Sequence, residues 1–152
     1  MTLLLFAGCA AVSPVPMAAT STPATSRLPS DLGESVTIEA DSLERVDGGR
    51  VIVFIGPVHV EWQRAWRLQA DRVEVYLDDA PSARITRATA TGNVRVVTRD
   101  CRIGQADRAE YRDDDERLRL SGNVRISLER KVVSGDELVL AVSRVFSFGG
   151  CA

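Results

Sequence analysis

The sequence predicts an all-β protein in which antiparallel strands form stacked repeats, and three observations support this prediction. Apolar and polar side chains alternate with a period of two from about Ser35 almost to the C-terminus, as expected for strands with one covered face. Clusters of Asp, Gly and Pro interrupt the alternation, as turns do. Two short motifs recur along the same region. No stretch of the sequence favours a long helix.

Residues 1–9 are expected to be a targeting segment rather than part of the fold. The apolar run that ends at Gly8 is too short to cross a bilayer as a helix. The string Leu5-Phe6-Ala7-Gly8-Cys9 resembles a bacterial lipobox, in which the cysteine receives lipid. Phe6 departs from the usual Leu, and a secretory signal would begin with a charged stretch. A start further upstream and an N-terminus with no targeting role therefore stay open as alternatives.

Residues 10–34 are expected to be a linker. This segment is rich in Ala, Ser and Thr, and it contains Pro14, Pro16, Pro23 and Pro29. Such a composition cannot build a core and favours a semi-extended chain. The folded domain is expected to span residues 35–148, with residues 149–152 as a tail.

Within this domain, each run of alternation is expected to be a short strand of a hairpin. In the run Val58 to Trp62 the apolar side chains fall on one face, whereas His59 and Glu61 fall on the other. The same alternation occurs in residues 36–40, 73–77, 117–120 and 124–128. Turn residues follow or separate these runs at 47–49, 78–81, 112–115 and 149–150.

Two motifs repeat along the domain. A Gly opens an alternating run at Gly56, Gly92 and Gly122, and an Asp after a small residue follows at Asp71, Asp107 and Asp136, with an earlier copy at Asp41. Units of about 30 residues that cannot bury an apolar face alone are expected to stack. We expect each Gly at a corner or bulge, and each Asp bonded to its own backbone at a bend. The Asp residues would be spread along the stack, which disfavours a calcium site.

Charge and motif content exclude several classes of function. The 19 basic and 21 acidic side chains form no basic stripe, so nucleic acid is not an expected partner. His59 is the sole histidine and is expected on the surface, with no nucleophile motif beside it. We therefore expect no enzyme, no cofactor and no metal site. Cys101 and Cys151 are expected either to form a disulfide or to remain two free thiols.

Five segments together resemble the OstA-like family, which includes lipopolysaccharide transport proteins of the LptA and LptC types. The match covers about Ser35 to Ser143, and the segments are residues 38–43, 56–60, 68–76, 90–94 and 120–124. The resemblance implies a twisted, open β-jellyroll whose groove holds the lipid A acyl chains of lipopolysaccharide. It also implies a periplasmic protein of a bridge to the outer membrane, either soluble like LptA or anchored like LptC, here through a lipidated Cys9.

The apolar positions of the alternating strands are the candidate groove. Burial of acyl chains would contribute about 0.8 kcal/mol per methylene without specific bonds, although an ordinary core would show the same alternation. The candidate lining residues are Val58, Val60, Trp62, Trp66, Leu68, Val73, Val75, Val94, Val96, Leu118, Leu120, Val124, Ile126, Leu138 and Leu140.

The ends of the domain are expected to be sheet edges. The strand at residues 36–40 and the run at 138–148 would pair with other OstA-like domains or with a second copy by strand addition. The alternative is an envelope scaffold of the bactofilin type that binds no lipid. That alternative predicts tighter repeats, a continuous apolar interior and a cytosolic location. The uneven Gly spacings of 36 and 30 residues and the export-like N-terminus weigh against it.

Overall fold

The computed structural model describes residues 24–29, 35–62, 66–79, 81, 83–98, 101–128 and 130–141, and these residues form an antiparallel sheet of nine strands. The all-β prediction is confirmed, and the helical content of the described residues is the short 3-10 turn η1 (Asp47–Gly49). The strands are β1 (Ala24–Pro29), β2 (Ser35–Ala40), β3 (Ser42–Val46), β4 (Val51–Trp62), β5 (Trp66–Leu77), β6 (Ile85–Thr98), β7 (Ile103–Arg112), β8 (Arg117–Leu128) and β9 (Lys131–Ala141).

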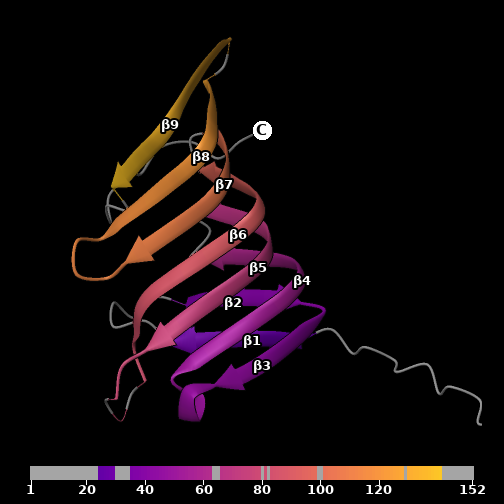
Figure 1. Ribbon diagram of the computed structural model, residues 1–152, viewed down its shortest axis with the longest axis vertical. Coiled ribbons are helices and arrows are strands. Elements are labelled where there is room, and N and C mark those ends of the chain that lie inside the picture. Colours follow the sequence, from indigo (N-terminus) through magenta and orange to yellow (C-terminus); the bar gives the residue numbers. More distant parts are fainter. Residues whose placement is uncertain are drawn as a thin grey trace, which may run out of the picture.

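The strands stack in chain order. The hydrogen-bonded order is β1-β2-β4-β5-β6-β7-β8-β9, and β3 pairs with the first half of β4 while β2 pairs with its second half. Figure 1 shows the result: bent strands succeed one another along the long axis, with β1 to β3 at one end and β9 at the other. Each strand therefore packs mainly against its neighbours in sequence, as the repeats predict.

The strands are longer than the sequence predicts. From β4 to β9 they contain 10 to 14 residues, whereas strands of about five or six residues are most common. The prediction of short strands was wrong because the Gly and Asp motifs bend the strands without ending them. Backbone pairing is present before and after each motif, so each long strand contributes one half to either side of the bend in the sheet.

The bends are β-bulges at the predicted Gly positions. The register shifts between Ile55 and Val58, between Thr91 and Val94, and between Ser121 and Val124, so that two residues of one strand oppose one residue of the next. The glycines there have φ of +101°, +78° and +75° at Gly56, Gly92 and Gly122. This is the left-handed region, which glycine adopts at little cost.

These bulges, which we call corners, fold the sheet into two layers. Layer one contains β3 and the strand halves 51–55, 72–77, 85–91, 108–112, 117–121 and 137–141. Layer two contains β1, β2 and the halves 58–62, 66–70, 94–98, 103–106, 124–128 and 131–135. One cluster of buried apolar side chains draws members from both layers, so the inward faces of the two layers share a core.

The Asp motifs lie beside the glycines, at the same corners. A Cβ on Gly92 would lie 2.5 Å from Oδ2 of Asp71, and one on Gly56 would lie 2.7 Å from Oδ2 of Asp41. The prediction of a Gly at each corner is confirmed, and a side chain at these positions would meet the Asp. Asp71 accepts a hydrogen bond of 2.8 Å from Nδ2 of Asn93. The contact observed for the Asp thus joins neighbouring units, whereas the sequence predicted a bond to its own backbone.

The N-terminal end of the sheet differs from the expected one. Strand β1 lies inside the segment 10–34 that was expected to be a linker, and its residues pair with β2 from Ala24 opposite Ala40 to Pro29 opposite Ser35. Strand β2 is consequently not the edge strand that the sequence predicted. At the other end β9 is the last described strand. Cys9, Cys151 and residues 142–152 lie outside the described residues.

Candidate functional site

The inward faces of the two layers form a continuous apolar surface. In layer two, one cross-strand row runs from Ile38 through Val60, Leu68 and Val96 to Val133 on β9. In layer one, a second row runs from Leu43 on β3 to Leu138 on β9. The intervening members of the second row are Phe54, Val73, Ala90, Ala109 and Leu120. The strand register thus brings side chains that are distant in sequence onto one surface.

All fifteen candidate lining residues belong to this apolar interior, and they fall into two groups. Eleven are buried: Val58, Val60, Trp62, Leu68, Val73, Val75, Val94, Val96, Leu118, Leu120 and Val124. Four are half-buried and pack against the buried cluster: Trp66, Ile126, Leu138 and Leu140. Three of the half-buried four lie on β8 and β9, so burial decreases toward the C-terminal end of the stack.

At β7 and β8, toward the C-terminal end of the stack, the two layers touch. Gly104 of layer two lies so close to Leu120 of layer one that a Cβ on the glycine would be 3.0 Å from Cδ1 of the leucine. The neighbouring inward positions on β6 and β7 are occupied by small residues, Ala88, Ala90 and Ala109. The two layers therefore approach each other closely there, with little space between their side chains.

Three aromatic side chains join the layers on the side away from the corners. Trp62 stacks on Trp66 with ring centroids 5.6 Å apart, and it contacts Tyr111 with centroids 5.2 Å apart at a tilt of 58°. Trp62 belongs to layer two and Tyr111 to layer one, so their contact spans the opening between the layers. We call these three residues the aromatic clasp.

The interior is open at β9. Val133 continues the inward row of layer two but is 54% exposed, and Leu138 and Leu140 are only half-buried. The reason is positional: β9 is the last described strand, so nothing described covers its outer edge. This end presents apolar surface to whatever adjoins it.

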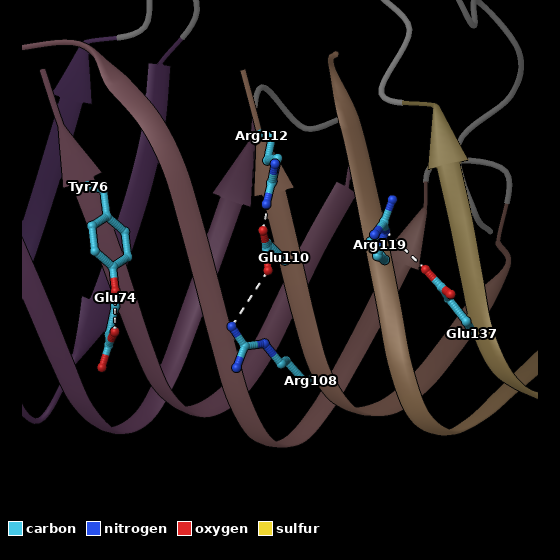
Figure 2. Close-up of polar contacts among 7 residues, drawn as sticks. All are labelled: Glu74, Tyr76, Arg108, Glu110, Arg112, Arg119 and Glu137. Atoms are coloured by element: carbon cyan, nitrogen blue, oxygen red, sulfur yellow. Dashed lines mark hydrogen bonds and ion pairs between the residues drawn. The ribbon is translucent and has the colours of Figure 1, made fainter. Parts of the chain in front are cut away.

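The outward face of layer one is polar, with glutamates held between arginines. Figure 2 shows Glu110 between Arg108 and Arg112, and Arg119 of β8 facing Glu137 of β9. Arg112 Nε lies 2.8 Å from Glu110 Oε1, and Arg119 Nε lies 3.0 Å from Glu137 Oε1. The hydrogen bond from Arg112 lowers the pKa of Glu110 below its ordinary value of 4.5, although partial burial opposes the shift.

On the same face, Glu74 has a different principal partner. The Tyr76 hydroxyl donates a hydrogen bond of 2.8 Å to Glu74 Oε2, which lowers the pKa of this carboxyl below 4.5, while burial opposes the shift and Arg72 reinforces it. The guanidinium of Arg87 lies 4.0 Å from the Tyr76 ring centroid. These contacts keep charged groups on the outside of the layer and leave the inside apolar.

His59 is exposed, as predicted, and its Nδ1 lies 3.2 Å from Nε2 of Gln69. Within the described ranges no three His, Cys, Asp or Glu side chains are grouped so that they could hold a metal ion. Nor does this part of the chain contain a helix long and apolar enough to cross a membrane. Cys101 is disulfide-bonded.

Sequence reasoning missed two features of the interior. It did not find the contact between Trp62 and Tyr111, because the two residues lie in different layers and only the fold brings them together. It also left out Val133, which lies opposite Ile126 of β8 and therefore faces inward. The signal was present but ambiguous, since two adjacent valines allow either register.

Comparisons with known proteins agree with this architecture. The family model described as LptA/(LptD N-terminal domain) LPS transport protein matches residues 37–145. Among solved structures, LptH, the LptA-homologous periplasmic component of the lipopolysaccharide transport device of Pseudomonas aeruginosa, superposes with a TM-score of 0.63. It is 22% identical, and the match covers 82% of this chain and 87% of that one. At this identity the likeness shows the fold, a β-jellyroll. A search among curated proteins finds no match.

The family match spans most of the described sheet, from β2 to β9 and slightly beyond. The motifs that carried the resemblance, the Gly corners and the adjoining Asp residues, are the positions at which the sheet folds into two layers. The relationship inferred from the sequence is thereby confirmed, and the chain belongs to the LptA/(LptD N-terminal domain) LPS transport protein family.

Proposed function

We propose that this chain carries lipopolysaccharide across the periplasm as one component of a bridge to the outer membrane, with the acyl chains held against the inward apolar face. The observation that carries the proposal is the continuity of this face from β2 to β9 and its exposure at Val133. Family membership supports the transport role. LptH is described as a periplasmic component, which supports a periplasmic location for this chain.

The apolar interior suits acyl chains for a physical reason. A hydrocarbon tail gains about 0.8 kcal/mol for each methylene that leaves water and needs no directional bonds. The open end at β9 offers Val133, Leu138 and Leu140 to such a tail. Gly104 on β7 and Leu120 on β8 bring the two layers into contact, so acyl chains that pass this point of the stack must separate the two layers there.

We also propose that the bridge is built by strand addition at the edges of the sheet. Strand β9 has an exposed edge, and Val132 and Val133 are 66% and 54% exposed. Exposed apolar edge strands invite pairing with another chain, and most proteins protect against it. A tether through a lipidated Cys9 would make the protein an anchored, LptC-like member, and mass spectrometry of the mature protein tests that alternative.

Site-specific photocrosslinking in living cells tests lipid carriage. The photoreactive residue replaces Val133 or Leu138, which face inward, or Val132 or Val139, which are their neighbours on the outward face of the same strand. We expect lipopolysaccharide to label at the inward pair and not at the outward pair. No labelling at the inward pair contradicts the proposal and leaves a scaffold that binds no lipid. Equal labelling at both pairs contradicts the placement of the acyl chains on the inward face.

A further inference from the structure

The corners of the stack follow a strict alternation. Strands β4, β6 and β8 carry a Gly corner with positive φ, whereas β5, β7 and β9 carry an Asp corner, as does the junction of β2 and β3 at Asp41. In each described case the Gly packs against the Asp of the strand before it: Gly56 on Asp41, Gly92 on Asp71 and Gly122 on Asp107.

An asparagine completes two of these three contacts. Asn93 and Asn123 follow the glycines, have φ of +48°, and donate hydrogen bonds of 2.8 and 2.7 Å to Oδ2 of Asp71 and Asp107. In the first unit Pro57 stands at this position, and proline has no side-chain donor. An Asp corner in this stack is thus matched by a Gly corner on the following strand, usually with Asn after it.

The last described strand ends the series on an Asp corner. Asp136 lies at the corner of β9, and residues 131–137 are all exposed. Register places Gly122 and Asn123 of β8 on its inner side, where the register shifts between Ser121 and Val124. On the outer side of β9 the described residues provide no strand. A strand added there would lie beside Asp136 in the way that β8 lies beside Asp107, and this position is open.

A second copy of the described sheet does not complete this pattern. Its N-terminal end presents Asp41 at the corner between β2 and β3, with β1 covering only the β2 half. End-to-end stacking of two copies would set Asp136 toward another Asp corner. Like charges on directly opposed strand positions destabilise a sheet.

We propose that the open edge of β9 binds an antiparallel strand of a different protein, and that this strand carries a Gly–Asn corner opposite Asp136. The glycine adopts positive φ and leaves room for the Asp side chain, and the asparagine donates to its carboxylate. Apolar residues alternate on either side of the corner, so that the inward face continues into the partner. This inference rests on the strand addition proposed above and specifies the partner.

Labelled peptides test the inference on the full-length protein. The probe has the sequence of β8, the 12-residue segment Arg117–Leu128, which contains a Gly–Asn corner. Companion peptides carry Gly122→Ala or Asn123→Ala, and a fourth has the sequence of residues 35–46, which contains the Asp41 corner between β2 and β3. Fluorescence anisotropy measures binding to the unmodified protein, to Asp136→Ala and to the matched control Ser134→Ala, which changes another exposed residue of β9.

We expect the β8 peptide to bind, and each altered corner to weaken binding about tenfold. Asn123→Ala removes one hydrogen bond to a charged group, and Gly122→Ala places a side chain against the carboxylate. Asp136→Ala should cause a similar loss, and Ser134→Ala should not. The inference is overturned if the β8 peptide does not bind, if the altered peptides bind equally well, or if the peptide of residues 35–46 binds as tightly.

The result is separable from the test of lipid carriage. Selective binding of Gly–Asn strands without lipopolysaccharide labelling at Val133 or Leu138 would support the inferred partner strand and contradict the transport proposal. Labelling without selective binding would support the transport proposal and contradict the inferred partner strand.

Discussion

The carboxylate of Asp107 on β7 occupies the space into which a side chain on Gly122 of β8 would project, since a Cβ there would lie 2.6 Å from Oδ2 and 3.0 Å from Cβ of the aspartate. Gly122 also has φ of +75°. Two separate effects therefore require glycine at this position, a steric contact and a left-handed backbone.

Substitution of Gly122 by Ala should separate these effects when it is compared with Gly48→Ala. Gly48 has a similar φ of +65°, but a Cβ added there would have no heavy atom within 4 Å. A left-handed backbone costs a non-glycine residue about 1–2 kcal/mol, so Gly48→Ala should lose that much stability. Gly122→Ala should lose about 1–3 kcal/mol more, because overpacking adds to the strain. Urea unfolding measures both, and equal losses would show that Asp107 moves aside freely.

Asn123 contributes to the same corner through its side chain. Replacement by Gly keeps the positive φ accessible but removes the hydrogen bond of 2.7 Å to Asp107. We expect the free energy of unfolding to fall by about 0.5–1.5 kcal/mol, the usual contribution of one hydrogen bond. In an Asp107→Ala background the same replacement should have almost no effect. An undiminished effect in that background would mean that Asn123 acts through some other contact.

The corners could be predicted from the sequence because their causes are local. Only glycine tolerates both the φ and the crowding at positions 56, 92 and 122, so the motif itself is the signal. The continuation of each strand through its corner could not be predicted. It depends on backbone pairing with two neighbouring strands, and the sequence of one strand does not reveal that pairing.

The same distinction explains the misassigned N-terminal segment. The composition of residues 10–34 favours a linker, yet Ala24–Pro29 pairs with β2. Proline lacks a backbone donor, but it is tolerated at the end of an edge strand, where one side needs no partner. The inward positions of the strands were predicted residue by residue because alternation identifies the inward face. Whether the inward side chains pack on one another depends on how closely the layers approach, as at Gly104 and Leu120.

Trp62 should contribute more to stability than its stacking partner. It is 6% exposed and contacts both Trp66 and Tyr111, whereas Trp66 is only half-buried. Trp62→Ala should lower the free energy of unfolding by about 3–5 kcal/mol, and Trp66→Ala by clearly less. If the clasp holds the layers together, Trp62→Ala should also raise binding of a hydrophobic dye to the still-folded protein. Equal losses for the two variants would contradict a special role for the contact with Tyr111.

The hydrogen bond from Tyr76 to Glu74 should make stability depend on pH. Because this bond lowers the pKa of Glu74 below 4.5 in the folded state, the folded protein favours the ionised carboxylate more than the unfolded chain does. The stabilisation is therefore fully present above pH 4.5 and is lost as the pH falls through the lower, folded-state pKa.

Tyr76→Phe tests this dependence. The variant should be less stable than the unmodified protein by about 1 kcal/mol or less at pH 7, as expected for a partly exposed hydrogen bond to a carboxylate. The difference should shrink below pH 4.5 in thermal unfolding. In a Glu74→Gln background the difference should no longer change with pH in this range. If the stability difference between the unmodified protein and the variant widens in acid, the pH dependence has the opposite sign and this explanation is excluded.

Thr89 should be replaceable with a gain in stability. Its side chain is buried, 5% exposed, and its hydroxyl has no hydrogen-bond partner within the described part of the chain. A buried hydroxyl without a partner costs about 1–3 kcal/mol, and valine has nearly the same shape and favours strands. Thr89→Val should therefore raise the free energy of unfolding by about 1 kcal/mol.

A matched control lies on the same strand. The hydroxyl of Thr86 donates a hydrogen bond of 3.2 Å to the carbonyl oxygen of Tyr76 on β5, so Thr86→Val removes a bond that is made. This variant should lose up to about 1 kcal/mol, opposite in sign to Thr89→Val. If both valine variants were stabilised alike, strand propensity alone would account for the gain. If Thr89→Val were destabilised, the hydroxyl must reach a partner, and the neighbouring Glu74 and Glu110, which flank Thr89 in register, would be the acceptors to examine.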